Sequence, residues 1–222
     1  MQFSEKISVI RAELQKPLPG EQQQYRMAPE FRGIPVSPSG KIRKAAVMIC
    51  IFPRKEDLKI IFFKRSDYDG PHGGQVSFPG GMFEEKDMDL AETAIRETME
   101  EIGLKIDKSA ILGALTPLQI PVSNMFVQPF VGFYPSEPVF TIEKREVDYL
   151  IISSIAELLD STIIRKERWM LHGRELEVPF YKVNENIIWG ATAMMLSEFL
   201  AVVSYSGLYP QSGYSDNDRT GT

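Results

Sequence analysis

Apolar positions near the start of the chain recur every three or four residues. These positions are Phe3, Ile7, Ile10 and Leu14. This spacing predicts an amphipathic helix over residues 3–14. Residues 15–40 show no such period and are rich in Pro, Gly, Gln and Ser, which predicts a linker. We therefore expect an N-terminal extension over residues 1–40, with the main domain beginning near Lys41.

Short apolar runs further along the chain predict β-strands. The predicted strands cover residues 45–52, 59–65, 111–120, 126–133 and 147–153. The first two runs are separated by a polar turn of hairpin length. Another hairpin is predicted around residues 172–174, between the runs at 169–171 and 176–181.

Two further segments have a helical pattern, and a glycine-rich loop precedes the first of them. Residues 69–81 are rich in glycine and contain two prolines, so they are predicted as a loop that leads into a helix over residues 89–103. A second helix is expected over residues 191–203, after a short helical turn at 154–159. The polar residues 206–222 are expected to form a tail. Because strands and helices do not alternate strictly, the pattern favours a mixed α/β sandwich over residues 41–205 rather than a doubly wound sheet.

Three carboxylates lie on one face of the helix at residues 89–103. Glu97, Glu100 and Glu101 are spaced i, i+3 and i+4, which places them within an arc of roughly 100°. A core-facing stripe is predicted on the opposite side, and it consists of Ala91, Ile95, Met99 and Ile102. Gly103 is placed to end the helix.

Like charges this close repel one another, and a bound divalent cation would reverse that cost. Carboxylate oxygens are hard ligands that suit Mg²⁺ or Mn²⁺. The alternative is a solvated acidic face in which Arg96 pairs with Glu92 and Glu100. The preceding Phe-Pro-Gly-Gly sequence at 78–81 favours the ligand-binding interpretation, because glycines let backbone groups approach a ligand or metal.

The Phe-Pro-Gly-Gly loop and the sequence from Arg96 to Leu104 together resemble the Nudix hydrolase signature, G-x5-E-x7-R-E-U-x-E-E-x-G-U, where U is a bulky aliphatic residue. Two positions depart from it. Thr98 stands at an aliphatic position, and Asp87 stands where the signature has Glu, with one residue inserted before Arg96.

A second motif is similar to that of the coenzyme A pyrophosphatase branch of this family, R-S-x-x-x-R-x-x-x-G-x-x-x-F-P-G-G. Arg65, Ser66, Gly74 and residues 78–81 match it in spacing. Gly70 replaces the second arginine, and Ile-Phe-Phe at 61–63 replaces Leu-Leu-Thr.

The resemblance implies a Nudix-type α/β/α sandwich with a mixed β-sheet and a loop-helix-loop metal site. It implies that Glu97, Glu100, Glu101 and the carbonyl of Gly81 bind Mg²⁺ or Mn²⁺, and that Arg96 orients the glutamates. The candidate general bases are Glu97, Glu143 and Glu146, all carboxylates that could deprotonate the attacking water. The candidate substrate contacts are Arg65, Ser66, His72 and Phe78.

The implied reaction is hydrolysis of the pyrophosphate of coenzyme A or acyl-CoA, which gives 4'-phosphopantetheine and 3',5'-ADP. Another nucleoside diphosphate derivative, such as ADP-ribose, an ADP-sugar or a nucleoside triphosphate, is the main alternative. A non-catalytic nucleotide-binding Nudix module is a further one. The resemblance also implies a homodimer.

Composition narrows the range of partners. The chain has 222 residues with 25 Lys and Arg against 30 Asp and Glu, so its net charge is -5 and nucleic acid is not expected as a ligand. The one cysteine, Cys50, lies in an apolar run and is expected in the core. The first residues lack the apolar run of a secretory signal, and the apolar stretch at 187–203 contains Glu198, so no membrane partner and a cytoplasmic setting are expected.

Overall fold

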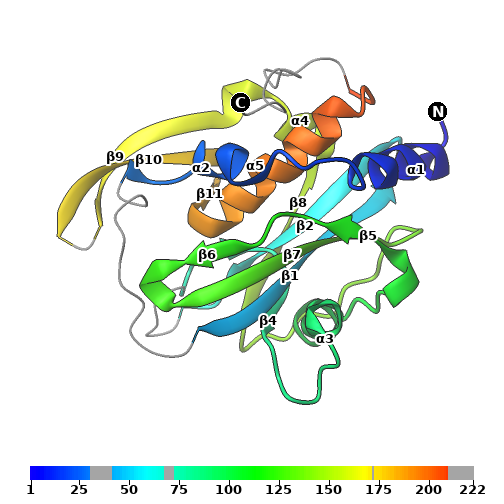
Figure 1. Cartoon of the computed structure of the whole chain (residues 1–222), viewed down its shortest axis with the longest axis horizontal. Coiled ribbons are helices and arrows are strands. Elements are labelled where there is room, and N and C mark those ends of the chain that lie inside the picture. Colours follow the sequence, from blue (N-terminus) through cyan, green and yellow to red (C-terminus); the bar gives the residue numbers. More distant parts are fainter. Residues whose placement is uncertain (31–41, 68–72, 172, 210–222) are drawn as a thin grey trace.

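A computed structural model describes residues 1–30, 42–67, 73–171 and 173–209. Its centre is a mixed β-sheet covered on both faces (Figure 1). Helix α3 (Leu90–Ile102) packs on one face, and α5 (Gly190–Tyr205) packs on the other together with α1 (Phe3–Glu13) and α2 (Gly20–Tyr25). The predicted α/β/α sandwich is therefore confirmed.

The main sheet has the strand order β3-β2-β1-β7-β5 along its path. Strands β1 (Arg43–Arg54) and β7 (Met125–Phe133) are parallel, and the other pairs are antiparallel, so the sheet is mixed as expected. β1 and β2 (Asp57–Arg65) form the predicted hairpin. The remaining strands are β3 (Val76–Ser77), β4 (Gly80–Met82), β5 (Ile111–Ala114), β6 (Leu118–Ile120) and β8 (Val147–Ser154).

β1 is buried along almost its whole length because both faces of the sheet are covered. Its alternate side chains enter two different cores. The core under α5 receives Ala45, Val47, Ile49 and Ile51, and the core under α3 receives Ala46, Met48, Cys50 and Phe52. Cys50 is fully buried, which confirms it as a core residue, and this burial raises the pKa of its thiol to about 12.

Helix α3 begins and ends where the sequence predicts. The Asp89 side chain accepts a hydrogen bond from the Glu92 amide (3.0 Å), and Gly103 ends the helix in the left-handed conformation (φ 70°). The predicted core-facing stripe was wrong at Met99, whose side chain is 49% exposed. Ala94 and Thr98 are buried instead, because the face that meets the sheet is rotated toward them.

The N-terminal segment packs closely on the domain. α1 confirms the predicted helix, and its residues Ile7 and Ile10 belong to the core under α5. α2 lies within the segment predicted as a linker, so that prediction was wrong for Gly20–Tyr25. The expected domain edge at Lys41 and the tail beyond residue 209 lie outside the described residues.

A second, three-stranded antiparallel sheet follows β8 and the short helix α4 (Ile155–Leu158). It consists of β9 (Ile164–Leu171), β10 (Arg174–Val183) and β11 (Asn186–Trp189). β9 and β10 form the second predicted hairpin, which extends away from the main sheet (Figure 1), whereas β11 was not expected. Single turns of 3₁₀ helix lie at Lys108–Ala110, Pro121–Ser123 and Ser161–Ile163. No helix within the described residues is long and apolar enough to cross a membrane.

Candidate active site

The Phe-Pro-Gly-Gly loop folds back on the sheet and brings its glycines to the side of α3. β4 pairs with β1, with Gly80 opposite Val47 and Gly81 opposite Ala46. A Cβ atom at Gly80 would clash with the carbonyl oxygen of Ala46 and lie 2.6 Å from the Cα of Val47, so only glycine allows this approach. The backbone of the loop is thus pressed between the sheet and the acidic face of α3.

Glu101 is the most buried carboxylate of that face, with only 1% of its surface exposed. The amide of Gly80 donates a hydrogen bond to its Oε2 atom at 2.8 Å. Burial raises the pKa of Glu101 to about 8, although the Gly80 amide and the charge of Arg65 act in the opposite direction.

Glu101 and Arg65 face each other with unsatisfied polar atoms. Arg65 Nη1 lies 3.8 Å from Glu101 Oε1, beyond hydrogen-bond distance. Within the described part of the chain, neither Glu101 Oε1 nor Arg65 Nε has a hydrogen-bond partner, although both atoms are buried. Unpaired buried polar atoms are costly, so these two atoms are free to pair with a ligand that reaches them.

Glu97 lies directly against Gly81, because a Cβ atom at Gly81 would clash with the Glu97 carboxylate. Burial raises the pKa of Glu97, and the nearby charges of Glu100 and Glu146 act in the same direction. Glu100 is more exposed and lies 3.8 Å from Lys86. The three glutamates thus share one side of the helix, as predicted, but their carboxylates have different partners. Within the described residues, no three or more His, Cys, Asp or Glu side chains are clustered as a preformed metal site.

Arg96 is held in place by many partners. Its Nε and Nη2 atoms donate to the two oxygens of Asp87 at 2.9 and 3.0 Å. Its Nη1 atom donates to Glu97 at 2.8 Å and to Glu100 at 2.9 Å. The alternative pairing with Glu92 does not occur, since Glu92 accepts from Lys108. The predicted orienting role fits this arrangement, which joins the metal-site candidates Glu97 and Glu100.

Asp87 was singled out only as a departure from the signature, and its function was missed. It also accepts hydrogen bonds from the Thr93 hydroxyl (2.8 Å) and the Glu84 amide (3.0 Å). Hydrogen bonds from Arg96, above all, hold the pKa of this carboxyl well below its usual range. The one feature of the sequence that pointed to Asp87 was its position, six residues after Gly81.

The second-motif residues Arg65, Ser66 and Gly74 form a wall beside the acidic face, and backbone hydrogen bonds hold it together. The Arg65 amide donates to the carbonyl of Gln75 (2.9 Å), and the Gly74 amide donates to the carbonyl of Ser66 (3.4 Å). The Ser66 amide donates to the carbonyl of Glu146 (2.9 Å), which ties this wall to the loop before β8. The Ser66 hydroxyl donates to the Lys144 carbonyl at 3.4 Å.

Two of the predicted substrate contacts need a different account. Phe78 is fully buried, and its ring stacks on Phe62 with centroids 4.7 Å apart. The prediction that Phe78 contacts substrate was therefore wrong, because this aromatic ring anchors the loop in the core under α5. His72, like Gly70, lies outside the described residues.

The loop at 141–146 packs against the C-terminal end of α3. The Glu143 amide donates to the Glu101 carbonyl (2.9 Å), and the Glu143 carboxylate accepts from the Arg145 amide (3.1 Å). Glu146 is exposed, and its charge contributes to raising the pKa of Glu97 and of Glu101. Of these two acidic residues, Glu146 is among the causes of the raised pKa of the candidate metal ligands Glu97 and Glu101.

The donor set suits a divalent cation chemically. It offers carboxylate oxygens and a backbone carbonyl, which are the ligands that Mg²⁺ and Mn²⁺ prefer. The unpaired Oε1 atom of Glu101 and the absence of a side chain at Gly81 fit such an ion. A cation here would also offset the cost of ionising Glu101 in its buried position.

Comparisons with known proteins bear on the family and the fold of the chain. Residues 42–171 match the family model of the NUDIX domain, which is more than half of the chain. The chain is 35% identical over 168 residues to Nudix hydrolase 22, chloroplastic, of Arabidopsis thaliana; the match covers 72% of the chain and 55% of that protein. It is 33% identical over 191 residues to a Yersinia enterocolitica protein named uncharacterized Nudix hydrolase NudL, covering 85% of the chain and 87% of that protein. The solved structure of a MutT/nudix family protein from Enterococcus faecalis has a similar fold (TM-score 0.54, 17% identity, 86% of this chain and 77% of that one).

Proposed function

The chain belongs to the Nudix family and is a hydrolase of phosphoric anhydrides, and we propose that it cleaves the pyrophosphate of coenzyme A or acyl-CoA with the help of Mg²⁺ or Mn²⁺. The products are 4'-phosphopantetheine and 3',5'-ADP. The observation that carries this proposal is the facing pair of Glu101 and Arg65, each with an unpaired buried polar atom, beside the glycine loop.

The coenzyme A assignment is supported by the second motif. Arg65, Ser66 and Gly74 match the branch pattern in spacing, and their backbone hydrogen bonds to one another and to Gln75 hold the motif together. Arg65 presents a guanidinium beside the acidic face, where its fork suits phosphate oxygens. We assign Arg65 to a substrate phosphate, with Ser66 completing the wall next to it.

Glu97, Glu100 and Glu101 would hold the cation, together with the carbonyl of Gly81. When bound, such an ion neutralises charge on the phosphoryl oxygens and lowers the pKa of water. Arg96 keeps Glu97 and Glu100 oriented, and Asp87 keeps Arg96 oriented in turn. This second layer of contacts is what holds the carboxylates in a reproducible geometry.

We assign the general base to Glu146, with Glu97 as the alternative. Glu146 is exposed to solvent and acts electrostatically on both Glu97 and Glu101, so a water molecule beside these residues is within its field. Glu143 is a weaker candidate, because its carboxylate is bound to the Arg145 amide. A base must lie within reach of the proton that it removes, and the hydrogen bond from the Ser66 amide to the Glu146 carbonyl keeps this residue beside Arg65 and Ser66.

Another nucleoside diphosphate derivative remains the second candidate substrate, because the motif departs from the branch pattern at Gly70 and at 61–63. A non-catalytic module is the weakest alternative, since all three glutamates of the signature are retained. The cytoplasmic setting and the homodimer remain predictions.

A substrate panel tests the proposal. Coenzyme A, acetyl-CoA, ADP-ribose, an ADP-sugar and a nucleoside triphosphate are each incubated at equal concentration with the protein and Mg²⁺. We expect the highest kcat/KM for coenzyme A or its thioester. The variant Glu97→Gln should lose turnover, whereas the control Glu92→Gln, on the same helix but paired with Lys108, should keep it. A clear preference for ADP-ribose or the triphosphate would overturn the coenzyme A assignment while preserving the chemistry.

A further inference from the structure

A cavity of about 240 Å³ lies where the end of β2 meets the second sheet. Its walls include side chains from β2, β8, β9 and β11, which are far apart in the sequence. The residues that matter for the argument are Lys64, Gln75, Tyr149, Trp169, Asn186 and Trp189. None of them is among the metal-ligand candidates of the acidic face.

The aromatic walls of this cavity are fixed before any ligand binds. The rings of Trp169 and Trp189 meet edge to face, with centroids 5.5 Å apart, and Trp169 also stacks on Phe180 at 5.4 Å. The Trp169 indole donates to Glu167 (3.1 Å), and the Tyr149 hydroxyl donates to Asn186 (2.7 Å). Half-buried tryptophans with fixed rings provide stacking area at a low cost in conformational entropy.

Lys64 supplies a cation to the same cavity. Within the described residues, its ammonium group makes no hydrogen bond or ion pair. A half-buried lysine with no partner among the described residues, next to aromatic rings, suits a ligand that combines a flat ring with a negative group. The lining also includes Glu185, whose carboxylate pairs with Lys182.

The cavity and the candidate active site meet at the end of β2. Successive strand residues point to opposite faces, so Lys64 and Arg65 project to the two sides of the sheet at the same place. Gln75 lines the cavity, and its carbonyl accepts the hydrogen bond from the Arg65 amide. A ligand bound to Arg65 would therefore lie next to this cavity, on the other side of the end of β2.

We propose that this cavity binds the nucleobase of the substrate, with the base stacked on Trp189 and edge-on to Trp169, and a phosphate of the same nucleoside contacting Lys64. This inference rests on the proposed function, since it assigns the base-binding part of that substrate. The volume is below the roughly 300–1,000 Å³ typical of pockets that enclose a whole small ligand, so it suits one ring system and not an entire dinucleotide-sized molecule. Stacking on aromatic side chains is tolerant of base identity, and Lys64 adds the preference for a phosphorylated nucleoside.

Tryptophan fluorescence gives a direct test, because Trp169 and Trp189 are the two tryptophans of the chain. The wild-type protein is titrated with adenosine monophosphate and, separately, with ribose 5-phosphate, which lacks the base. We expect saturable quenching by adenosine monophosphate and none by ribose 5-phosphate. Equal responses to both, or no response to either at concentrations above the substrate KM, would overturn the assignment.

Kinetic variants give the second readout. Lys64→Gln and Trp189→Leu should raise KM for the best substrate by about tenfold with kcat little changed. Lys166→Gln is the matched control, because Lys166 lies on β9 outside the cavity and pairs with Glu177. An unchanged KM in both cavity variants would overturn the inference. Base-dependent quenching without hydrolysis of any panel substrate would support the pocket and overturn the proposed function, so the two failures are distinguishable.

Discussion

Asp87 accepts hydrogen bonds from Arg96 through both of its carboxylate oxygens, with donor–acceptor distances of 2.9 and 3.0 Å. The pair links the loop before α3 to the helix itself, and Arg96 passes the constraint on to Glu97 and Glu100. The signature position that normally holds Glu is thus filled by a shorter carboxylate that still reaches the arginine.

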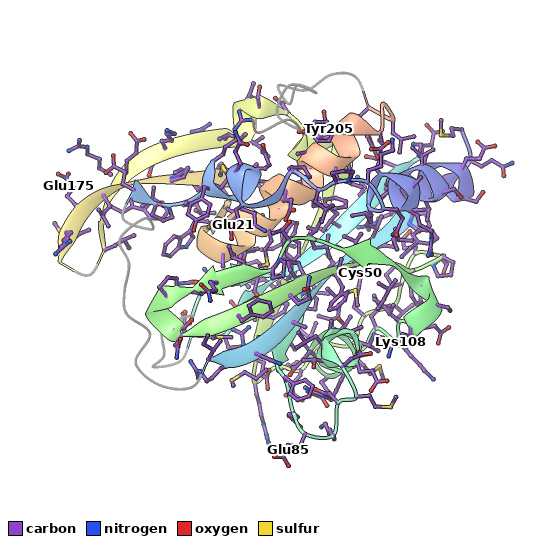
Figure 2. All side chains as sticks on the ribbon, in the orientation of Figure 1. Glu21, Cys50, Glu85, Lys108, Glu175 and Tyr205 are labelled. Carbon is purple, nitrogen blue, oxygen red and sulfur yellow. The ribbon has the colours of Figure 1, made fainter. Side chains whose placement is uncertain are left out.

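Replacing Asp87 with Asn should weaken both the fold and the site. We expect the free energy of unfolding to fall by about 1–2 kcal/mol, because charge-assisted hydrogen bonds to Arg96 are lost. Activity should fall by about 10- to 100-fold, the usual effect of losing a residue that orients metal ligands. Urea titration and steady-state kinetics measure the two effects. Glu85→Gln is the control, because Glu85 points out from the same loop (Figure 2); a similar loss in this control would contradict the account.

The two neighbouring glycines of the loop should respond differently to alanine. In Gly81→Ala the new Cβ meets only the end of the Glu97 side chain, which can rotate away. We expect the free energy of unfolding to change by less than about 1 kcal/mol, while kcat falls on the order of 100-fold because Glu97 is displaced. In Gly80→Ala the Cβ meets backbone atoms of β1, so stability should fall by about 2–3 kcal/mol or more. Equal stability losses in the two variants would count against the geometry described.

The buried Glu101 predicts a pH-dependent stability in buffer that contains a chelator. A glutamate in the unfolded chain titrates near 4.5, whereas burial raises the pKa of Glu101 to about 8. The neutral form is favoured in the fold, so this contribution is fully present below pH 4.5 and is lost as the pH rises through about 8. The free energy of unfolding should therefore drop on the order of 2–4 kcal/mol between about pH 5 and pH 9.

Glu101→Gln supplies the comparison for this titration. Glutamine keeps an acceptor for the Gly80 amide but cannot ionise, so the pH-dependent drop should disappear. Adding Mg²⁺ to the wild-type protein at high pH should restore stability, because an ion that binds only the folded state stabilises it. The same pH dependence in Glu101→Gln, or no effect of Mg²⁺, would show that Glu101 is not the group responsible.

Glu198 of α5 should be essential for holding the N-terminal segment. Its fully buried carboxylate accepts hydrogen bonds from the Gly20 amide, the Gln24 side chain and both the amide and hydroxyl of Thr116. Glu198→Leu leaves these donors without an acceptor, and we expect a loss of about 3–5 kcal/mol in the free energy of unfolding. Thermal or urea unfolding measures this loss. Glu21→Gln, on the exposed side of α2 (Figure 2), should be within about 0.5 kcal/mol of wild type.

The sequence predicted those features that depend on local period or local turn chemistry. Helix α3 was placed by its apolar spacing, by its acidic face and by Gly103, and the two hairpins by polar turns between apolar runs. The predicted core-facing stripe of α3 was wrong at Met99, because the spacing of apolar residues gives the direction of the buried helix face only to within about one residue. The orientation that buries Ala94 and Thr98 is decided by the sheet beneath.

Features that depend on partners far away in the sequence were missed. The predicted strand at 111–120 is broken into β5 and β6. Between them the Thr116 amide donates to Glu198 of α5, and Pro117 has no amide hydrogen for the ladder. α2 was read as linker because its Gln-rich sequence has no apolar period, yet buried Gln23 and Gln24 bind Ser197 and Glu198.

The candidate site shows the same division. Arg96 and the three glutamates were found from spacing on one helix, whereas the loop contacts that complete the site come from tertiary packing. Phe78 was misassigned because a motif position does not say whether its side chain faces solvent or core. Asp87 was underrated because its partner, Arg96, lies nine residues further along the chain, inside α3, beyond the reach of a helix-spacing argument.

The most direct test is the fate of coenzyme A incubated with the protein and Mg²⁺, followed by chromatography of the nucleotide products. The account predicts equal amounts of 3',5'-ADP and 4'-phosphopantetheine from the wild type and from Glu92→Gln, and none from Glu101→Gln. Intact coenzyme A after incubation with the wild type, or undiminished cleavage by Glu101→Gln, would contradict it.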